Sequence, residues 1–260
     1  MAGLYDRREA GTLLLGAAAA LAAPGMARAA ASSRNVRIGA RPDPVELALG
    51  QTALLVIDME NDFGAKGGMF DLAGIDIGEI RAVIPNVRRA LDAARDAGIP
   101  VAYVNMAYNA DLSDAGRVDG PNRLKQDPIG IGRPVPAPDG TRGGILVRGS
   151  WGTQVVSELA PLAGELTVYK TRYSGFANTT LHAELQARDI RNLVVTGCTT
   201  SVCVESTVRD AMFLDYTCLL LEDCMAEPQG AANHAATLDI LAQRFAWVGD
   251  SRRFAAALAH

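Results

Sequence analysis

The sequence predicts an α/β protein built on a mostly parallel six-stranded sheet with helices on both faces. Six short apolar or β-branched runs alternate with segments of helical periodicity, and such alternation predicts right-handed crossovers between parallel strands. The first run, residues 52–57, is apolar without interruption, as expected for a strand covered on both faces. With 260 residues, 49% of them hydrophobic, the chain can bury one sizeable core.

Residues 1–31 have the features of an export signal rather than of a folded segment. Arg7 and Arg8 precede an apolar run at 13–23, and Ala-Arg-Ala at 27–29 is a small-x-small cleavage site. The pair of arginines resembles a twin-arginine signal, although the apolar pair that usually follows is missing. The run is shorter than the roughly 20 residues of a membrane anchor. We therefore expect periplasmic export and no membrane attachment after leader removal; the alternative is a cytoplasmic protein with a loose N-terminal arm.

An extended arm is expected over residues 32–50, which contain two prolines. Residues 51–260 are expected to form one domain. After the first strand, apolar positions at helical spacing predict a helix over 77–97, which ends at Gly98. A second buried strand is expected at 100–104.

Residues 107–149 are rich in Gly, Pro and Asp and show no periodicity. Loops of this length are uncommon inside a compact domain and often act as lids or binding loops. We interpret this segment as an excursion that covers the substrate. A short helix at 151–159 and a third strand at 166–169 are expected after it.

The second half continues the alternation of strands and helices. The expected elements are a helix at 179–187, a strand at 193–196, a helix from residue 202, a strand at 217–221, a helix at 231–245, a strand at 246–248 and a closing helical turn at 251–260.

Polar side chains follow four of these strands, at the point where each strand ends. They are Asp58, Lys170, Cys203 and Asp223. In parallel sheets, ligands bind beyond the carboxyl ends of the strands. The sequence therefore predicts a site at this edge of the sheet.

Cys203 is the candidate nucleophile, because Gly197 breaks the preceding strand and Thr199 begins a run of helix-capping residues. A thiol in a first helical turn lies near unpaired N–H groups and the positive end of the helix dipole. We expect these to lower its pKa from about 8.5 towards neutrality and to hold the oxyanion of an attacked carbonyl. The alternative is an inert core cysteine, since free cysteines are commonly buried.

A cysteine nucleophile needs a base, and the three histidines lie in predicted helices or at the C-terminus. Asp58 is a better candidate, because desolvation at a buried strand end raises a carboxyl pKa towards the working range. Lys170 can compensate its charge and stabilise the thiolate. Taken singly, Asp58 could instead be a helix cap and Lys170 a surface lysine.

Three ordered motifs carry a resemblance to a known family: Leu-Val-Ile-Asp-Met-Glu-Asn-Asp-Phe around Asp58, Tyr-Lys-Thr-Arg-Tyr-Ser-Gly-Phe around Lys170, and Thr-Gly-Cys-Thr-Thr-Ser-Val-Cys-Val-Glu-Ser-Thr around Cys203. Over residues 52–248 the chain resembles the isochorismatase-like cysteine hydrolases. The resemblance implies a three-layer α/β/α Rossmann-like sandwich and an Asp58-Lys170-Cys203 catalytic triad. It also implies a non-proline cis peptide before Thr199, which would direct the Thr199 and Cys203 N–H groups at one oxyanion.

Within that family the motifs look closest to ureidoacrylate and biuret-type amidohydrolases, and N-carbamoyl amidases are similar. The resemblance implies a cysteine hydrolase that cleaves a C–N bond of a small amide or ureide through a thioester. The chain departs from the ureidoacrylate pattern after the second strand, where it has Met106 and Tyr108 in place of an Asn and a Trp. The candidates for substrate binding are Asn105, Tyr108, Trp151, Tyr173 and Phe176.

Composition and motif content limit the partners. A net charge of −4 and a pI near 5.4 argue against a nucleic-acid partner. Only three histidines are present, and the zinc-binding Asp-x-His of nicotinamidases is absent from the motifs, so we predict no metal and no cofactor. We expect a homo-oligomer, either a dimer or a tetramer, acting on a small-molecule substrate.

A second hypothesis is a non-hydrolytic protein on the same fold, either a binding module or a thiol redox sensor. Cys198 lies five residues before Cys203 and could act as a resolving thiol. Vinyl-ether hydrolysis of isochorismate is disfavoured, because the enzymes that resemble this chain and catalyse it lack the cysteine found at position 203.

Overall fold

The computed structural model describes residues 34–259, so the predicted export signal lies outside the described residues. Its central sheet has six strands, which are β3 (Thr52–Ile57), β4 (Val101–Met106), β7 (Leu166–Lys170), β8 (Asn192–Cys198), β9 (Thr217–Ala226) and β10 (Trp247–Gly249). Their order across the sheet is β10-β9-β8-β3-β4-β7, and each neighbouring pair is parallel. The predicted α/β class is confirmed, and this sheet is entirely parallel.

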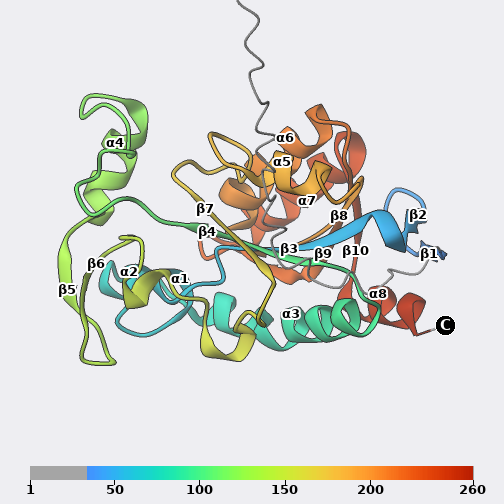
Figure 1. The fold of residues 1–260 in the computed structure, drawn as a ribbon, viewed down its shortest axis with the longest axis horizontal. Coiled ribbons are helices and arrows are strands. Elements are labelled where there is room, and N and C mark those ends of the chain that lie inside the picture. The colour runs from blue at the N-terminus through green and yellow to red at the C-terminus, as the bar shows by residue number, and fades with distance from the viewer. Residues whose placement is uncertain (1–33, 260) are drawn as a thin grey trace, which may run out of the picture.

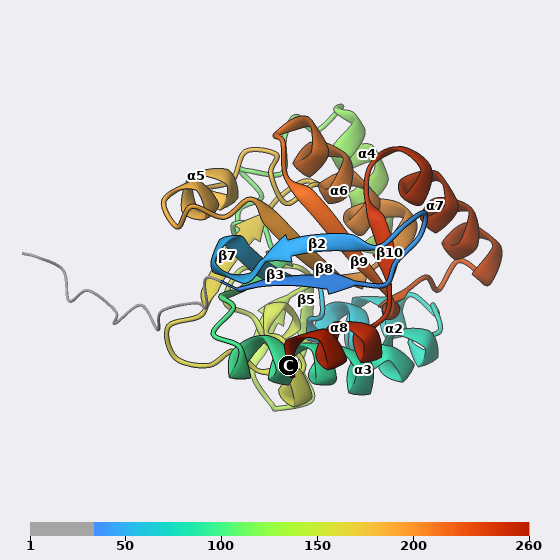
Figure 2. The same ribbon diagram turned by 90° about the vertical axis from the view of Figure 1, so that its right-hand side faces the viewer.

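Helices cover both faces of the sheet and complete a three-layer sandwich (Figures 1 and 2). The helices are α3 (Gly78–Asp96) and α8 (Ser251–Leu258) on one face, and α5 (Leu181–Gln186), α6 (Glu205–Phe213) and α7 (Ala231–Arg244) on the other. Successive side chains of a strand point to opposite faces. In β3, Leu54 and Val56 accordingly join the core under α3, whereas Leu55 and Ile57 join the core under α6. An uninterrupted apolar run is therefore needed to fill both cores.

The arm before the sheet differs from its prediction. Instead of one extended segment, β1 (Asn35–Ile38) and β2 (Val45–Ala48) form an antiparallel ribbon. Val36 and Leu47 are paired and buried, and alternation of apolar and polar residues gives the ribbon one face that packs on the domain. The two prolines lie in the connection between the strands, where a lost backbone donor costs little.

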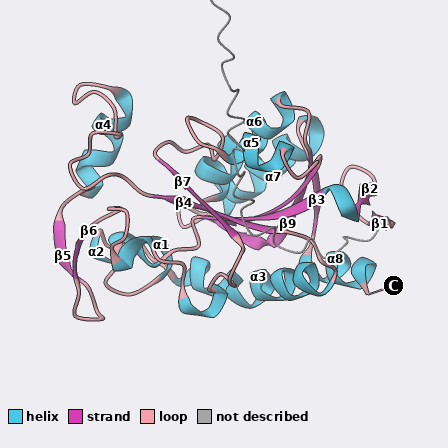
Figure 3. Cartoon of the chain, in the orientation of Figure 1, coloured by secondary structure: helices cyan, strands magenta, loops and turns pink. Residues whose placement is uncertain are grey.

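The predicted excursion leaves the carboxyl edge of the sheet, at the opposite end from the β1–β2 ribbon (Figures 1 and 3). It contains α4 (Pro121–Gln126), the 3₁₀ turn η2 (Asp127–Ile129) and a small ribbon of β5 (Pro134–Pro136) and β6 (Arg142–Gly144). Two short helices, α1 (Asn61–Gly64) and α2 (Met69–Leu72), lie at the same end. The helix predicted at 151–159 is instead two 3₁₀ turns, η3 (Trp151–Thr153) and η4 (Ser157–Leu159).

Among residues 34–259 no helix is long and apolar enough to cross a membrane.

Candidate active site

The chain reverses its direction across the sheet between β3 and β8. From β3 it proceeds outward through β4 to β7, and it then returns to build β8, β9 and β10 on the other side. Ligands of open parallel sheets bind at such a reversal, beyond the carboxyl ends of the strands. Asp58 directly follows β3 and Cys203 lies in the turn after β8, so these two side chains flank the reversal.

Asp58 lies in a backbone turn that stops β3. Its φ is +52°, in the left-handed region that Asp tolerates better than most residues, and its N–H donates to the Val104 carbonyl at 3.0 Å. The side chain is fully buried. The predicted strand-end position of this carboxyl group is confirmed.

Lys170 connects the carboxylate to the thiol. Its Nζ lies 2.8 Å from Asp58 Oδ2 and 3.3 Å from Cys203 Sγ. The Asp58 and Lys170 side chains are completely shielded from solvent, and Cys203 is 5% exposed. Three residues drawn from three strand ends therefore meet around one point, as the sequence predicts.

The segment that carries Cys203 is a strand, a turn and a helix. β8 ends at Cys198, the Cys198–Thr199 peptide is cis, and a π-helical turn η5 (Thr200–Val204) leads into α6. Gly197 has φ +120°, and a Cβ there would lie 2.0 Å from the Ile57 carbonyl oxygen. Only glycine allows β8 to approach β3 this closely beside Asp58.

Two groups that sequence reasoning missed hold this turn in place. The Glu227 carboxylate accepts the Ser201 N–H at 2.8 Å, and the Thr200 hydroxyl is 2.9 Å from His234 Nδ1. Glu227 is buried one residue past the end of β9, and His234 lies on α7. Their relevance arises from the tertiary contact of β9 and α7 with the turn, which leaves no local sequence signal.

The protonation states of the triad differ in part from expectation. Burial raises the pKa of Asp58 against the attraction of Lys170, as predicted. Burial also tends to lower the pKa of Lys170, but the charges of Asp58 and Cys203 outweigh it, so that pKa is raised and the ammonium form is retained.

The expected lowering of the Cys203 pKa is wrong. Burial, followed by the negative charge of Asp58, raises the pKa of the thiol above its ordinary value, although Lys170 opposes the shift. The first-turn N–H groups act over a short range and do not compensate the loss of water around a buried sulfur. Burial therefore favours the thiol form of Cys203, so a base would have to take its proton before the sulfur could act as a nucleophile.

A cavity of about 410 Å³ opens above the triad. Cys203, Thr199 and Met106 form its sheet-edge wall, which puts the sulfur within reach of a bound molecule. The remaining lining comes from α1, from α2 and the connection after it, from the excursion, from the turn η5 and from the segments after β7 and β9. It consists of Phe63, Met69, Phe70, Gly74, Ile75, Asp76, Lys125, Gln126, Ile129, Tyr173, Val202, Pro228 and Gln229.

Comparison with known proteins identifies the family. The sequence profile of the isochorismatase domain matches residues 52–253. The chain belongs to the isochorismatase family.

Relatives within the isochorismatase family include proteins named ureidoacrylate amidohydrolase RutB. The one from Cronobacter turicensis is 40% identical over 223 residues, which cover 86% of this chain and 95% of that protein. The one from Rhizobium rhizogenes is 40% identical over 224 residues, covering 86% and 90% respectively.

Solved structures of the family have the same fold. A cysteine hydrolase from Pseudomonas syringae superimposes with a TM-score of 0.68 at 27% identity and covers 88% of this chain and 98% of its own. N-carbamoylsarcosine amidase from Thermoplasma acidophilum superimposes with a TM-score of 0.58 at 26% identity, covering 77% and 96%. The predicted isochorismatase-like sandwich is confirmed.

The substrate-binding candidates are only partly brought together. Tyr173 lines the cavity, whereas Asn105 is buried behind it and donates to the Thr153 carbonyl at 3.3 Å. Tyr108 is also buried, with its hydroxyl 3.3 Å from the amide nitrogen of Asn122.

Trp151 and Phe176 do not line this cavity either. Trp151 borders a separate small depression next to Asp62. The Phe176 ring stacks on Tyr216 with the ring centroids 5.7 Å apart, on the face of the sheet covered by α5 and α6. The excursion instead contributes Lys125, which its helical turn brings to the cavity.

Asp223 does not reach the site, although the sequence places it at a strand end. β9 continues to Ala226, so Asp223 lies within the strand and accepts hydrogen bonds from the Ser251 N–H and hydroxyl at 2.8 and 2.7 Å. It therefore anchors α8. The strand is longer than its apolar run because β8 and β9 shift register between Val195 and Gly197 and continue pairing.

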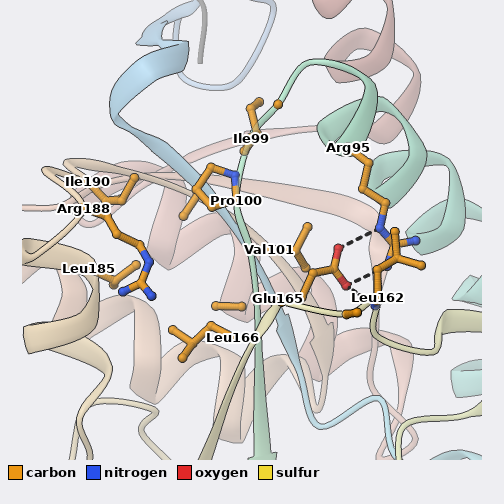
Figure 4. Close-up of a pocket in the computed structure, with 15 residues that line it drawn as sticks. Arg95, Ile99, Pro100, Val101, Leu162, Glu165, Leu166, Leu185, Arg188 and Ile190 are labelled. Atoms are coloured by element: carbon orange, nitrogen blue, oxygen red, sulfur yellow. Dashed lines mark hydrogen bonds and ion pairs between the residues drawn. The ribbon is translucent and has the colours of Figure 1, made fainter. Parts of the chain in front are cut away.

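A second cavity, of about 450 Å³, lies at the opposite edge of the sheet, where β3, β4 and β7 begin (Figure 4). Its charged groups are already paired. Arg95 contacts Glu165 at 2.8 Å, and Arg188 contacts Glu184 at 2.6 Å. With its polar groups engaged and no nucleophile in its lining, this cavity offers no chemistry comparable with that at Cys203.

The other thiols are poorly placed for redox exchange. Cys198, Cys218 and Cys224 are free and buried, and burial raises the pKa of each. Cys198 Sγ lies 3.2 Å from the Asp58 carbonyl oxygen, to which it donates. A resolving thiol must become a thiolate, and this environment disfavours one at Cys198. In the part of the chain that the structure describes, no three His, Cys, Asp or Glu side chains are grouped as metal ligands.

Proposed function

We propose that this chain is a cysteine-dependent amidohydrolase that cleaves a C–N bond, other than a peptide bond, in a small linear amide or ureide. The observation that carries the proposal is the contact of Lys170 with both Asp58 and Cys203, whose sulfur lies at the wall of a cavity. The names of the relatives, ureidoacrylate amidohydrolase and N-carbamoylsarcosine amidase, support a ureide or N-carbamoyl compound as substrate.

The proposed reaction begins when Asp58 accepts the Cys203 proton and the sulfur attacks the substrate carbonyl. The raised pKa of the thiol makes a base necessary, and the raised pKa of Asp58 makes its carboxylate a better proton acceptor than an exposed one. Lys170 remains charged and stabilises the anionic sulfur. The backbone N–H groups of Thr199 and Cys203 are proposed to hold the oxyanion.

The second half of the reaction uses the same carboxyl group in reverse. Asp58 returns the proton to the departing amine, which leaves a thioester on Cys203. A water molecule then attacks the thioester, with Asp58 accepting its proton, and free Cys203 is regenerated. When the acyl group is carbamoyl, the product is carbamate, which decomposes to carbon dioxide and ammonia.

The charged groups of the cavity lining suggest what else the substrate carries. Lys125 and Asp76 are the two charged side chains of the lining, and both are exposed. Lys125 has no ion pair with any residue in the described part of the chain. An ammonium at the rim of a mainly apolar cavity favours an anionic group at the end of the substrate remote from the scissile bond. We assign it to the carboxylate of a ureido or N-carbamoyl acid.

A panel of amides and ureides, scored for ammonia release, tests the proposed activity. We expect turnover of N-carbamoyl and ureido acids and little turnover of peptides. Failure of every linear amide and ureide, with a correctly folded protein, would contradict the proposal. The redox-sensor alternative requires instead a Cys198–Cys203 disulfide under mild peroxide, which peptide mapping detects.

We also propose that the protein acts in the periplasm as a homo-oligomer. The twin arginines and the Ala-Arg-Ala sequence at 27–29 support export. Cell fractionation together with N-terminal sequencing of the mature protein tests the location, and cytoplasmic protein with an intact N-terminus would contradict it. Light scattering of the mature chain tests the oligomeric state.

A further inference from the structure

A second carboxyl group, that of Glu60, is buried next to the base and takes no part in the reaction described above. Glu60 lies two residues after Asp58, is fully shielded from solvent and does not line the cavity. Its backbone is fixed by α1, since the Phe63 and Gly64 N–H groups donate to its carbonyl at 3.1 and 2.9 Å. It therefore cannot contact substrate, and any role must act through its neighbours.

Hydrogen-bond acceptors outnumber donors around Glu60. Asp58 Oδ1, both Glu60 carboxyl oxygens and Asn105 Oδ1 are buried without a hydrogen-bond partner among the described residues. The Met106 N–H lies near both carboxyl groups and favours their ionised forms, but at this geometry it completes a hydrogen bond with neither. Glu60 and Asn105 lie under the same segment, because Glu60 pairs with Val155 and Asn105 donates to Thr153. A buried group of acceptors without a donor is costly.

The charges around Glu60 also disfavour its ionised form. The charged and titratable groups that face Glu60 are Asp58 from β3, Asp62 from α1, Lys170 from β7 and Cys198 from β8. One ammonium cannot balance two buried carboxylates and also stabilise a thiolate. Burial first, then the negative charges of Asp58 and Asp62, raises the pKa of Glu60 well above its ordinary value.

We propose that Glu60 is a positioning residue held as a neutral carboxylic acid beside Asp58, where its O–H supplies the donor that this buried group of acceptors lacks. The neutral acid leaves the charge of Lys170 available to Asp58 and the thiolate. It also fixes the surroundings of the base without lining the cavity. This inference rests on the proposed hydrolysis, which it deepens.

Unfolding equilibria test the protonation state without any assay of turnover. A group whose pKa is raised in the folded state contributes stability below its ordinary pKa and loses it as pH rises towards the folded value. Relative to Glu60→Gln, the unfolding constant of the wild type should therefore increase as pH rises above the ordinary glutamate pKa of 4.5, by up to about tenfold per pH unit. Glu79→Gln is the matched control, because Glu79 is exposed and should show no such trend. If the ratio of the unfolding constants of the wild type and Glu60→Gln did not change with pH, the proposal would be overturned.

Activity tests the positioning role. Glu60→Ala should lower kcat/KM by at least about tenfold, whereas Glu60→Gln should keep it within about threefold of the wild type, because an amide supplies an uncharged donor. Equal losses in both folded variants would contradict the role. If no ureide is hydrolysed by the wild type, the proposed function fails while the unfolding test still decides the state of Glu60.

An infrared measurement covers the case in which Glu60→Gln does not fold. Wild-type protein labelled with carboxyl-¹³C glutamate should show, near neutral pH, a C=O stretch of a protonated carboxylic acid that shifts with the label. Exposed glutamates are ionised there and contribute nothing to this band. The absence of a label-sensitive band would overturn the proposal on the wild-type protein alone.

Discussion

At the scale of single residues, the thiol and its two charged neighbours form one electrostatic unit. Sequence reasoning identifies all three residues, because each lies at or just past the carboxyl end of a strand. It fails for the pKa of Cys203, since it considers the helix start and not the depth of burial or the facing carboxylate. Asp58 thus has two effects on the thiol: its charge disfavours the resting thiolate, and its basicity permits the transient one.

These two effects have opposite consequences in Asp58→Asn. Removal of the carboxylate lowers the Cys203 pKa, so alkylation by iodoacetamide at mildly alkaline pH should be several-fold faster than in the wild type. Turnover should nevertheless fall by at least about a hundredfold, because the base is lost. Alkylation rates and kcat/KM, measured on the same samples, check the predicted increase in alkylation and the predicted loss of turnover.

Asp76→Asn is the control for this prediction. It removes a carboxylate of the cavity lining that is not among the groups acting on Cys203, so alkylation should be unchanged. Slower alkylation in Asp58→Asn than in the wild type would contradict the electrostatic coupling described above.

At the scale of elements, the turn between β8 and α6 depends on the close approach of two strands. Gly197 is the residue that permits it, since any side chain there would meet the Ile57 carbonyl directly before Asp58. The sequence marks this glycine only as a break in an apolar run. Its packing against β3 could not be predicted, because the neighbour lies 140 residues earlier in the chain.

Gly197→Ala is expected to destabilise the protein by more than about 2 kcal/mol, through the clash and the positive φ. Gly98→Ala is a suitable comparison, since Gly98 also has a positive φ, of +70°, but a Cβ there would meet nothing within 4 Å. The comparison variant should lose only about 1 kcal/mol. Urea unfolding of the two variants checks the difference, and equal losses would show that the close approach is unimportant.

The excursion is the other element with a predicted role, and Lys125 on α4 carries it. Lys125→Met should raise KM for an N-carbamoyl acid by at least about tenfold and leave KM for its uncharged amide analogue nearly unchanged. Lys66→Met removes an exposed cation that does not line the cavity and should alter neither value. If Lys125→Met changed KM equally for the acid and the amide, the proposed contact between Lys125 and a substrate carboxylate would be contradicted.

At the scale of the whole molecule, the parallel topology explains why so much of the site could be predicted. Alternating strands and helices put every carboxyl end on one edge, which brings Asp58, Lys170 and Cys203 together without further information. The cavity wall could not be predicted in the same way, because it depends on how α1, α2 and the excursion pack against that edge. Two of the aromatic residues predicted to bind substrate, Trp151 and Phe176, accordingly lie elsewhere.

The central claim is that Cys203 forms a thioester with the substrate acyl group, and mass spectrometry of acid-quenched turnover tests it most directly. The account predicts an acyl adduct on the peptide that contains Cys203, together with ammonia release, and neither in Cys203→Ala, whose fold should be intact because only a small side chain is removed. Wild-type rates in Cys203→Ala, or an adduct confined to another thiol, would contradict it.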